Sequence, residues 1–215
     1  MSLTLYYHPL SSFCQKALIA LYENETAFAP HMVDLMDETS RAAFLKIWPI
    51  GKFPVLRDED AGETIAEATI IIEYLAQHYP GRTKLVPDAP DMSRRTRMAD
   101  RFYDLYINTQ VGKIVTNRLR PADQKDTAGV EQAHAQIQTA LDMTDKDMAE
   151  KEWATGDAFT MADCAAAPAL FYADKITPFA QTHKNAYAYL QRLMARPSYA
   201  RALKEAEPYL EMMPK

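Results

Sequence analysis

The sequence predicts a two-domain fold, with an N-terminal α/β domain of order βαβ-α-ββα and an all-helical C-terminal domain. Strand-like segments alternate with helical patterns over roughly the first 80 residues, a proline-rich segment follows, and beyond it apolar residues recur only at helical spacing. The chain has 215 residues, enough to bury two cores. We therefore assign 1–82 to the α/β domain, 83–91 to a linker and 92–215 to the helical domain.

The first half of the α/β domain is expected to run strand, helix, strand, helix. Residues 3–7 predict a strand, and from about Ser11 the apolar residues repeat with helical periodicity. An extended segment at 28–35 and a polar helix at 37–47 follow. This alternation is typical of a βαβα unit.

The second half of that domain is expected to form an antiparallel hairpin and a further helix. Two short strands flank the acidic turn at 58–62, and a helix follows through 70–79. In the helical domain, 161–173 is nearly free of charge and predicts a helix buried on most sides. We expect Pro168 to kink that helix or to begin a new turn.

Composition and charge exclude several classes of protein. A formal charge of −5 without a long basic run argues against a nucleic-acid partner. The chain starts without a signal-peptide pattern and has no apolar run long enough to span a membrane, so we expect a cytoplasmic protein. Cys14 and Cys164 lie far apart with no Cys/His cluster, so neither a metal site nor a structural disulfide is expected.

The junction between the first strand and the first helix carries the first candidate chemistry. A helix N-terminus has unpaired N–H groups and a partial positive charge, which favour a thiolate beside it. The hydroxyl of Ser11 or Ser12 can donate a hydrogen bond to such an anion, although either serine could equally serve only as the helix cap. Tyr7 is a secondary donor candidate, and for Cys14 we favour packing over a nucleophilic role.

The second candidate is the segment 51–56, where a proline enters an extended run. A proline within a strand is usually confined to an edge. We therefore expect the backbone groups of Phe53 and Val55, on either side of Pro54, to remain free for a peptide-like ligand. Lys52 would meet a ligand carboxylate there, or be a solvated loop lysine.

The third candidate precedes the apolar run at 70–72. Thr64 and Glu67 match a capping box, which would give them a purely structural role. The functional alternative is that Glu67 accepts a substrate ammonium group while the amides of Ala68 and Thr69 hold a carboxylate. A zwitterionic ligand would fit this arrangement.

The ordered set SSFC, GKFPVL and IAEATIIIEYL, followed by a helical half, resembles the glutathione transferase superfamily. The segment 153–163, with Thr160 and Asp163, resembles the capping box that precedes the buried helix of this family. The resemblance implies a thioredoxin-like domain that binds glutathione and a helical domain that lines the pocket for the second substrate. It also implies a homodimer and a role in detoxification.

The resemblance assigns glutathione-binding roles to Lys52, Phe53, Pro54, Val55, Glu67, Ala68 and Thr69. Pro54 would be a cis-proline, and Val55 would pair its backbone with the cysteinyl part of glutathione. Glu67 would bind the γ-glutamyl amine, and Lys52 would lie near the glycyl end. Ala68 departs from the serine that is common in the family, so only its amide remains to bind the carboxylate.

For the group that activates the thiol we rank Ser11 first, then Ser12 and Tyr7, with Cys14 last as a mixed-disulfide nucleophile. The expected electrophile pocket contains Leu10, Phe13, Tyr103 and Tyr106. A core position is the alternative for either of the last two tyrosines.

The leading function is a glutathione transferase that activates the glutathione thiolate for attack on a small apolar electrophile, without a metal. A glutathione-dependent disulfide reductase or isomerase is the nearest alternative. A noncatalytic binding protein with the same fold is the third, favoured by the departure at Ala68.

Overall fold

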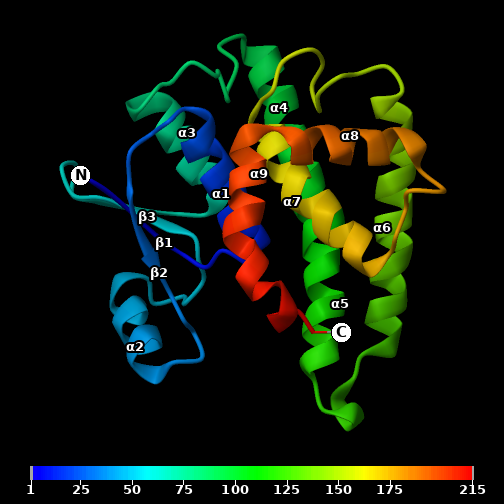
Figure 1. Ribbon diagram of the computed structural model, residues 1–215, viewed down its shortest axis with the longest axis horizontal. Coiled ribbons are helices and arrows are strands. Elements are labelled where there is room, and N and C mark those ends of the chain that lie inside the picture. The colour runs from blue at the N-terminus through cyan, green and yellow to red at the C-terminus, as the bar shows by residue number, and fades with distance from the viewer. Residues whose placement is uncertain (1, 215) are drawn as a thin grey trace.

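The computed structural model describes residues 2–214 and confirms the predicted fold class (Figure 1). A four-stranded mixed sheet with its helices forms the N-terminal part of the chain, and the described residues that follow form only helices and loops. The N-terminal elements are β1 (Leu3–Tyr7), α1 (Ser12–Glu23), β2 (Ala29–Met32), α2 (Glu38–Ile47), β3 (Val55–Asp58), β4 (Glu63–Ala66) and α3 (Ala68–His78).

The sheet has the strand order β2-β1-β3-β4, in which β1 pairs in parallel with β2 and β3 is antiparallel to both of its neighbours. This is the thioredoxin-like arrangement. Leu3 and Leu5 alternate along β1 with less buried residues, and both belong to the core that holds Leu18 and Leu21 of α1. The period-two pattern of the strand and the apolar face of the helix therefore meet in one core.

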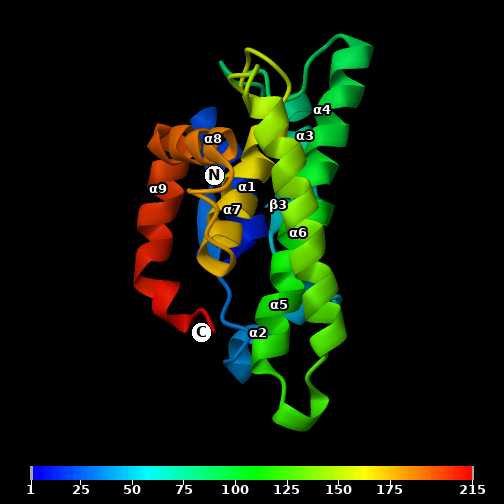
Figure 2. The same cartoon turned by 90° about the vertical axis from the view of Figure 1, so that its right-hand side faces the viewer.

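The helical part packs against the first helix of the sheet domain. Figure 2 shows α7 in the middle of the molecule, and α7 contacts both α1 and α4. The elements of the helical part are α4 (Pro90–Phe102), the π-helix η1 (Tyr103–Asn108), α5 (Thr109–Leu119), the 3₁₀-helix η2 (Ala122–Gln124), α6 (Thr127–Met148), α7 (Met161–Ile176), α8 (Lys184–Ala195), α9 (Pro197–Ala206) and the 3₁₀-helix η3 (Glu207–Met212).

Helix α7 is buried from Met161 to Ala173, as its lack of charge predicts. Pro168 lies inside this helix, which continues to Ile176, so the expected new turn at the proline is not formed. Proline removes one N–H donor from the helical ladder, but α7 is enclosed by neighbouring elements whose packing keeps it continuous.

The capping box at the start of α7 is confirmed. The Asp163 carboxylate accepts hydrogen bonds from the N–H of Thr160 at 2.8 Å and the N–H of Ala154 at 2.8 Å. It also accepts one from the Tyr189 hydroxyl at 2.6 Å, and Asp163 is fully buried. One carboxylate thus joins the 153–156 turn, α7 and α8.

The acidic turn between β3 and β4 is closed by Asp58. Its carboxylate accepts hydrogen bonds from the hydroxyls of Tyr74 and Tyr79 and from the N–H groups of Asp60 and Ala61. The hydrogen bond from Tyr79 is the main cause that holds the pKa of Asp58 below its usual value. The hairpin is therefore tied to α3 by an ionised carboxylate.

We predict that Asp58→Asn lowers the free energy of unfolding at pH 7 and makes it less dependent on acid pH. The folded-state pKa of Asp58 lies below the unfolded value of about 3.9, so its contribution is present above that value and is lost as pH falls through the folded pKa. Urea titrations at several pH values measure this. A gap between the two proteins that stays constant from pH 7 to pH 2.5 would contradict it.

Candidate functional site

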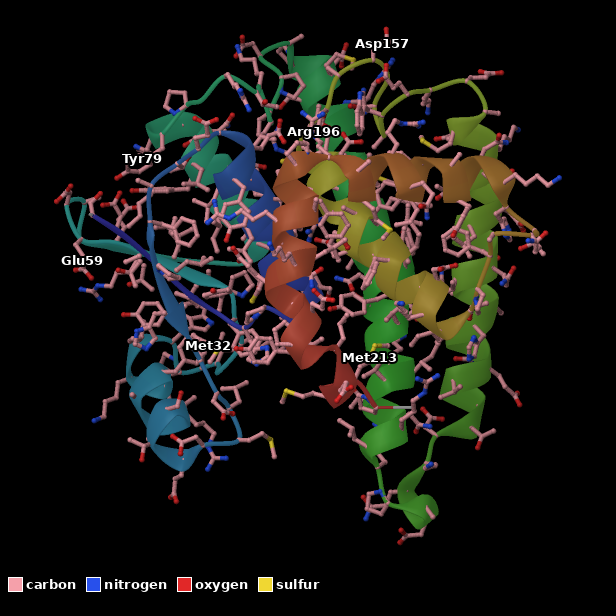
Figure 3. All side chains as sticks on the ribbon, in the orientation of Figure 1. Met32, Glu59, Tyr79, Asp157, Arg196 and Met213 are labelled. Carbon is pink, nitrogen blue, oxygen red and sulfur yellow. The ribbon has the colours of Figure 1, made fainter. Side chains whose placement is uncertain are left out.

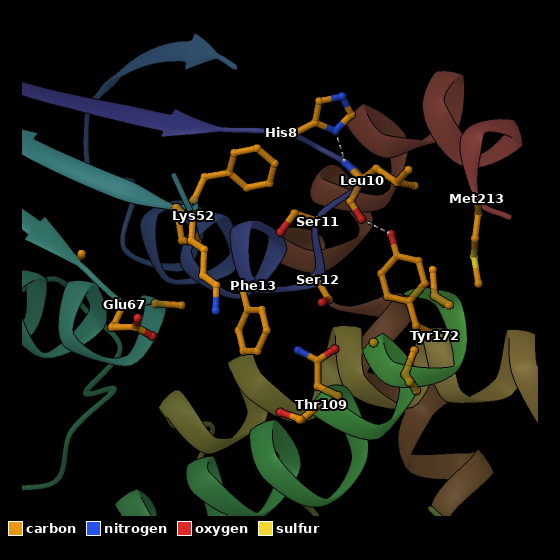
Figure 4. A pocket seen from close by; sticks show the side chains of 18 of the residues that line it. His8, Leu10, Ser11, Ser12, Phe13, Lys52, Glu67, Thr109, Tyr172 and Met213 are labelled. Atoms are coloured by element: carbon orange, nitrogen blue, oxygen red, sulfur yellow. Dashed lines mark hydrogen bonds between the residues drawn. The ribbon is translucent and has the colours of Figure 1, made fainter. Parts of the chain in front are cut away.

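A cavity of about 650 Å³ lies between the sheet domain and the helical domain. Figure 4 shows Lys52 and Glu67 on one side, Tyr172 and Met213 on the other, and Ser11 and Ser12 between them. Its lining residues come from six separate parts of the chain: His8, Leu10, Ser11, Ser12, Phe13, Trp48, Lys52, Phe53, Pro54, Ala66, Glu67, Ala68, Asn108, Thr109, Val111, Gly112, Val115, Tyr172, Met213 and Pro214.

Helix α1 begins at the floor of this cavity. Ser11 is its N-cap, and the Ser11 hydroxyl oxygen accepts a hydrogen bond from the N–H of Cys14 at 3.3 Å. A hydroxyl that accepts one bond can still donate its hydrogen to another group. Ser12 is the first residue of the helix, where the N–H groups are free. Capping and ligand binding are therefore compatible at Ser11.

Cys14 does not line this cavity. Its side chain is fully buried, and burial raises the pKa of the thiol to about 12. A thiol with that pKa is almost entirely protonated at pH 7. These observations support the packing role that the sequence favoured for Cys14.

Tyr7, the third-ranked donor candidate, does not line the cavity. It follows Leu3 and Leu5 on the same face of β1 and packs against the main core. Burial raises the pKa of its phenol, and the charge of Glu205 raises it further. Because side chains alternate along a strand, the position of Tyr7 near the strand end does not bring its hydroxyl to the cavity.

The Phe53–Pro54 peptide bond is cis, as the resemblance implies, and both residues line the cavity. Val55 does not: it is fully buried and pairs with Tyr6 on one side and Ala66 on the other. The expected sheet edge is therefore wrong for Val55, because β3 is an inner strand. Phe53 lies just outside that strand, and its backbone groups have no hydrogen-bond partner within residues 2–214.

Glu67 stands at the entrance to α3 in an unusual conformation. It is the N-cap of this helix with φ of 69° and ψ of 120°, and its exposed side chain makes no capping hydrogen bond. Thr64 lies in β4 opposite Arg57, so the capping box expected between Thr64 and Glu67 is not formed. A non-glycine residue held at positive φ costs energy and is often found at functional sites. Ala68 follows as the first residue of α3 and also lines the cavity.

Thr69 lies beside the cavity, in a buried ionic cluster that we call the Lys16 cluster and that the sequence analysis missed. The Lys16 ammonium lies 2.6 Å from Oδ1 of Asp100 and 2.7 Å from Oδ2 of Asp104. It donates a hydrogen bond to the Thr69 hydroxyl at 2.8 Å, and that hydroxyl donates to Asp100 at 2.8 Å. Arg101 completes the cluster through Asp100 and Asp104. A lysine in the middle of a largely apolar helix, α1, was the available signal.

Tyr103 and Tyr106, which the resemblance places in the electrophile pocket, also lie outside the cavity. Tyr103 is buried and lines a separate cavity of about 350 Å³ between α4 and α6. Tyr106 is 40% exposed and packs edge-on against Phe102 at 5.7 Å between ring centroids. Leu10 and Phe13, by contrast, line the main cavity as expected.

Three further lining residues were not singled out from the sequence: His8, next to the predicted junction, and Tyr172 and Met213, which reach the cavity from distant segments. His8 packs edge-on against Tyr209 at 5.0 Å, and burial lowers its pKa. The Tyr172 hydroxyl donates to the carbonyl of Leu10 at 2.6 Å. Met213 lies near the C-terminal end of the described chain, beyond α9 (Figure 3).

Within residues 2–214, no helix is both long and apolar enough to cross a membrane. The same residues contain no group of three or more His, Cys, Asp or Glu side chains placed to hold a metal ion.

The fold and the cavity define a thioredoxin-like protein with a fused helical domain that shares the site. Comparison of the sequence with protein families agrees with this class. Residues 5–83 match the glutathione S-transferase N-terminal domain, and residues 107–197 match the glutathione S-transferase C-terminal domain. Together these matches cover most of the chain, which belongs to the cytosolic glutathione transferase superfamily.

Individual relatives are similar over nearly their full lengths. Glutathione S-transferase hmp2 of Hypomyces subiculosus is 26% identical over 96% of this chain and 100% of its own. Glutathione S-transferase GstB of Escherichia coli K12 is 25% identical over 91% of this chain and 95% of its own.

Solved structures share the fold. A glutathione S-transferase from Methylobacillus flagellatus with glutathione bound superposes with a TM-score of 0.86 at 24% identity, over 94% of this chain and 98% of its own. One from Methylobacterium radiotolerans in complex with glutathione sulfonate gives 0.82 at 25% identity, over 93% of each chain.

We predict that Lys16→Met lowers the free energy of unfolding by about 3–5 kcal/mol, because it removes the buried cation that both carboxylates contact and leaves them only the half-exposed Arg101. Urea denaturation measures the change. Lys151→Met, which breaks an exposed ion pair with Asp147, is the control and should cost at most about 1 kcal/mol. Equal effects of the two substitutions would contradict a structural role for the Lys16 cluster.

Proposed function

We propose that this protein is a glutathione transferase that activates the glutathione thiol at the N-terminus of α1 for attack on an apolar electrophile. One observation carries the proposal. Two serines at a free helix N-terminus share a cavity with a cis-proline and an unpartnered glutamate. The family membership and the glutathione bound in the Methylobacillus relative support it.

In this proposal the polar side of the cavity binds glutathione. The Glu67 carboxylate accepts the γ-glutamyl ammonium, and the amides at the start of α3, at Ala68 and Thr69, bind its carboxylate. Phe53, rather than Val55, pairs its free backbone groups with the cysteinyl part, since only Phe53 lies at the cavity. Lys52 binds the glycyl carboxylate.

The thiol then lies over the first turn of α1. The Ser11 hydroxyl donates a hydrogen bond to the thiolate, and the helix N-terminus adds a favourable field. Ser12 is the second choice of donor. Both interactions favour the anion and so lower the pKa of the bound thiol.

The helical side of the cavity receives the electrophile. Leu10, Phe13, Val111 and Val115 give this side an apolar surface, which binds by excluding water and selects mainly on size. The thiolate attacks a carbon held there.

A disulfide reductase that uses a cysteine of this chain is the less favoured alternative. Cys14 and Cys164 are both fully buried, and burial raises the pKa of each thiol. An isomerase, in which glutathione adds and then leaves, uses the same thiolate. A noncatalytic binding protein remains as the third alternative, supported by Ala68 in place of the serine of the family.

We also propose a cytoplasmic homodimer with a role in detoxification. Ile70 of α3 and Met98 of α4 are 51% and 57% exposed, close to the ion pair between Glu73 and Arg97 that joins these helices. Exposed apolar side chains beside charged ones fit an interface between two copies. Sedimentation velocity measures the oligomeric state.

We predict that Ser11→Ala raises the pKa of the bound glutathione thiol by about one to two units, because the thiolate loses a hydrogen bond from its donor. Calorimetry measures glutathione binding, and ultraviolet difference spectra across pH measure the thiolate. Ser12→Ala is the matched variant and should change the thiol pKa less.

The outcomes separate the candidate functions. If Ser12→Ala raises the thiol pKa more than Ser11→Ala does, Ser12 is the hydrogen-bond donor to the thiolate. Binding by the wild type without a lowered thiol pKa would favour the noncatalytic protein, and no binding at millimolar glutathione would overturn the proposal.

We predict that Glu67→Gln weakens glutathione binding about 10- to 100-fold, because a charged hydrogen bond to the ammonium group is lost. The free energy of unfolding should change by less than about 0.5 kcal/mol, since the exposed carboxylate makes no capping hydrogen bond. Calorimetry and urea denaturation measure the two quantities. Unchanged affinity would exclude Glu67 from the glutathione site.

A further inference from the structure

The turn at residues 8–11 brings Ser11 to the cavity, and its first three carbonyls all accept hydrogen bonds. The carbonyl of His8 accepts one from the N–H of Ser11 at 3.0 Å, which closes a β-turn with Pro9 at its second position. The N–H of Leu10 donates to Nδ1 of His8 at 3.2 Å. These two bonds lie within the turn, and the other two carbonyls are held by side chains from outside it.

Gln15 and Tyr172 hold those two carbonyls. The Gln15 side-chain amide donates to the carbonyl of Pro9 at 2.9 Å and to the Tyr172 hydroxyl at 3.0 Å. The Tyr172 hydroxyl donates in turn to the carbonyl of Leu10 at 2.6 Å, as Figure 4 shows. Burial raises the pKa of the Tyr172 phenol to about 12, so the hydroxyl keeps its hydrogen at neutral pH. The two side chains therefore bind two successive carbonyls of the turn as a connected pair.

Packing alone does not explain the glutamine at position 15. Gln15 is fully buried in α1, and within residues 2–214 its Oε1 atom has no hydrogen-bond partner. A buried oxygen without a partner costs free energy, which an apolar side chain of similar volume would avoid. The side-chain nitrogen, by contrast, uses both of its hydrogens. The amide hydrogens, and thus the hold on the turn, are what this residue supplies.

The hydrogen bond from Tyr172 acts on the peptide group that leads into Ser11. The Leu10 carbonyl and the Ser11 N–H belong to one planar unit. Tyr172 binds its oxygen and the His8 carbonyl binds its N–H, so the plane is fixed on both sides. Beyond this plane, the Ser11 hydroxyl oxygen is fixed by the N–H of Cys14. Only the hydroxyl hydrogen remains free to turn toward a ligand.

Tyr172 reaches this turn from the other domain. It belongs to α7 of the helical part, whereas the turn and Gln15 belong to the sheet domain. Helix α7 contacts α1 directly, and Tyr172 is only 6% exposed. The helical part therefore supports the serine that the sheet domain presents to the cavity.

We propose that Gln15 and Tyr172 are positioning residues for the Ser11 hydroxyl. By holding the peptide plane before Ser11, they direct the hydroxyl hydrogen toward the thiol of bound glutathione. A hydrogen bond weakens when its distance or angle departs from the optimum, so a displaced donor stabilises the thiolate less. This inference rests on the proposed transferase function and adds two residues that act through Ser11.

The test measures the pKa of the thiol of glutathione bound to the full-length protein, by ultraviolet difference spectra across pH. Tyr172→Phe keeps the ring and removes the hydroxyl, and Gln15→Leu removes the amide at similar volume. We expect each substitution to raise the pKa of the bound thiol by about 0.5 to 1 unit. In the Ser11→Ala background, the same substitutions should change it by less than about 0.2 unit, because the group through which they act is gone.

Two controls separate positioning from folding. Tyr199→Phe removes a buried hydroxyl that lies outside the cavity and has no partner within residues 2–214, and it should leave the thiol pKa unchanged. S-Methylglutathione has no ionisable thiol, so calorimetry should show its Kd changed by less than about threefold in Tyr172→Phe and in Gln15→Leu. Urea denaturation shows that each variant is folded, and if one of the two does not fold, the other decides.

The outcomes separate the positioning role from the proposed function. A rise in thiol pKa that persists in the Ser11→Ala background would overturn the positioning role alone. An unchanged thiol pKa in the folded variants, or an equal loss of affinity for glutathione and S-methylglutathione, would overturn it as well. If the wild type binds glutathione without lowering its thiol pKa, the transferase proposal fails, and the positioning role fails with it.

Discussion

The buried Lys16 cluster is the interaction on which the two-domain arrangement depends. Lys16 belongs to the sheet domain, whereas Asp100 and Asp104 belong to the helical domain. A lysine in an apolar interior is tolerated only when carboxylates and hydroxyls replace its water. Separating the domains would leave these charges without partners, so the cluster strongly favours one relative position. The cavity lies between the two surfaces that this position brings together.

Because the two domains are held in this position, the cavity has one polar wall and one apolar wall. The sheet side supplies charged and hydrogen-bonding groups at loop and helix ends, including Glu67 and Ser11, where the backbone leaves amides unpaired. The helical side supplies mostly apolar side chains from α5. A cavity with one polar and one apolar wall suits a reaction between a hydrophilic thiol and an apolar partner. Neither wall alone encloses enough surface to bind both.

The features that depend only on residues close together in the sequence were predicted correctly. The strand-to-helix junction at Ser11, the proline at 54 and the Thr160 to Asp163 capping box all have local signatures, and each occurs where expected. What depends on pairing between distant segments was not predicted. Val55 was misplaced because strand order decides whether its backbone is free. Tyr103 was misplaced because helical periodicity does not reveal which neighbouring helix a side chain meets, and Tyr103 lies in the cavity between α4 and α6.

The end of the chain has a practical consequence. Met213 and Pro214 line the cavity, and the Arg118 side chain donates a hydrogen bond to the Pro214 carbonyl at 3.0 Å. Any sequence fused after this point would leave from the rim of the cavity and compete with ligands for access. The N-terminal end lies on the sheet side, away from that rim (Figure 1). An affinity tag for purification or immobilisation therefore belongs at the N-terminus, where it leaves the entrance open.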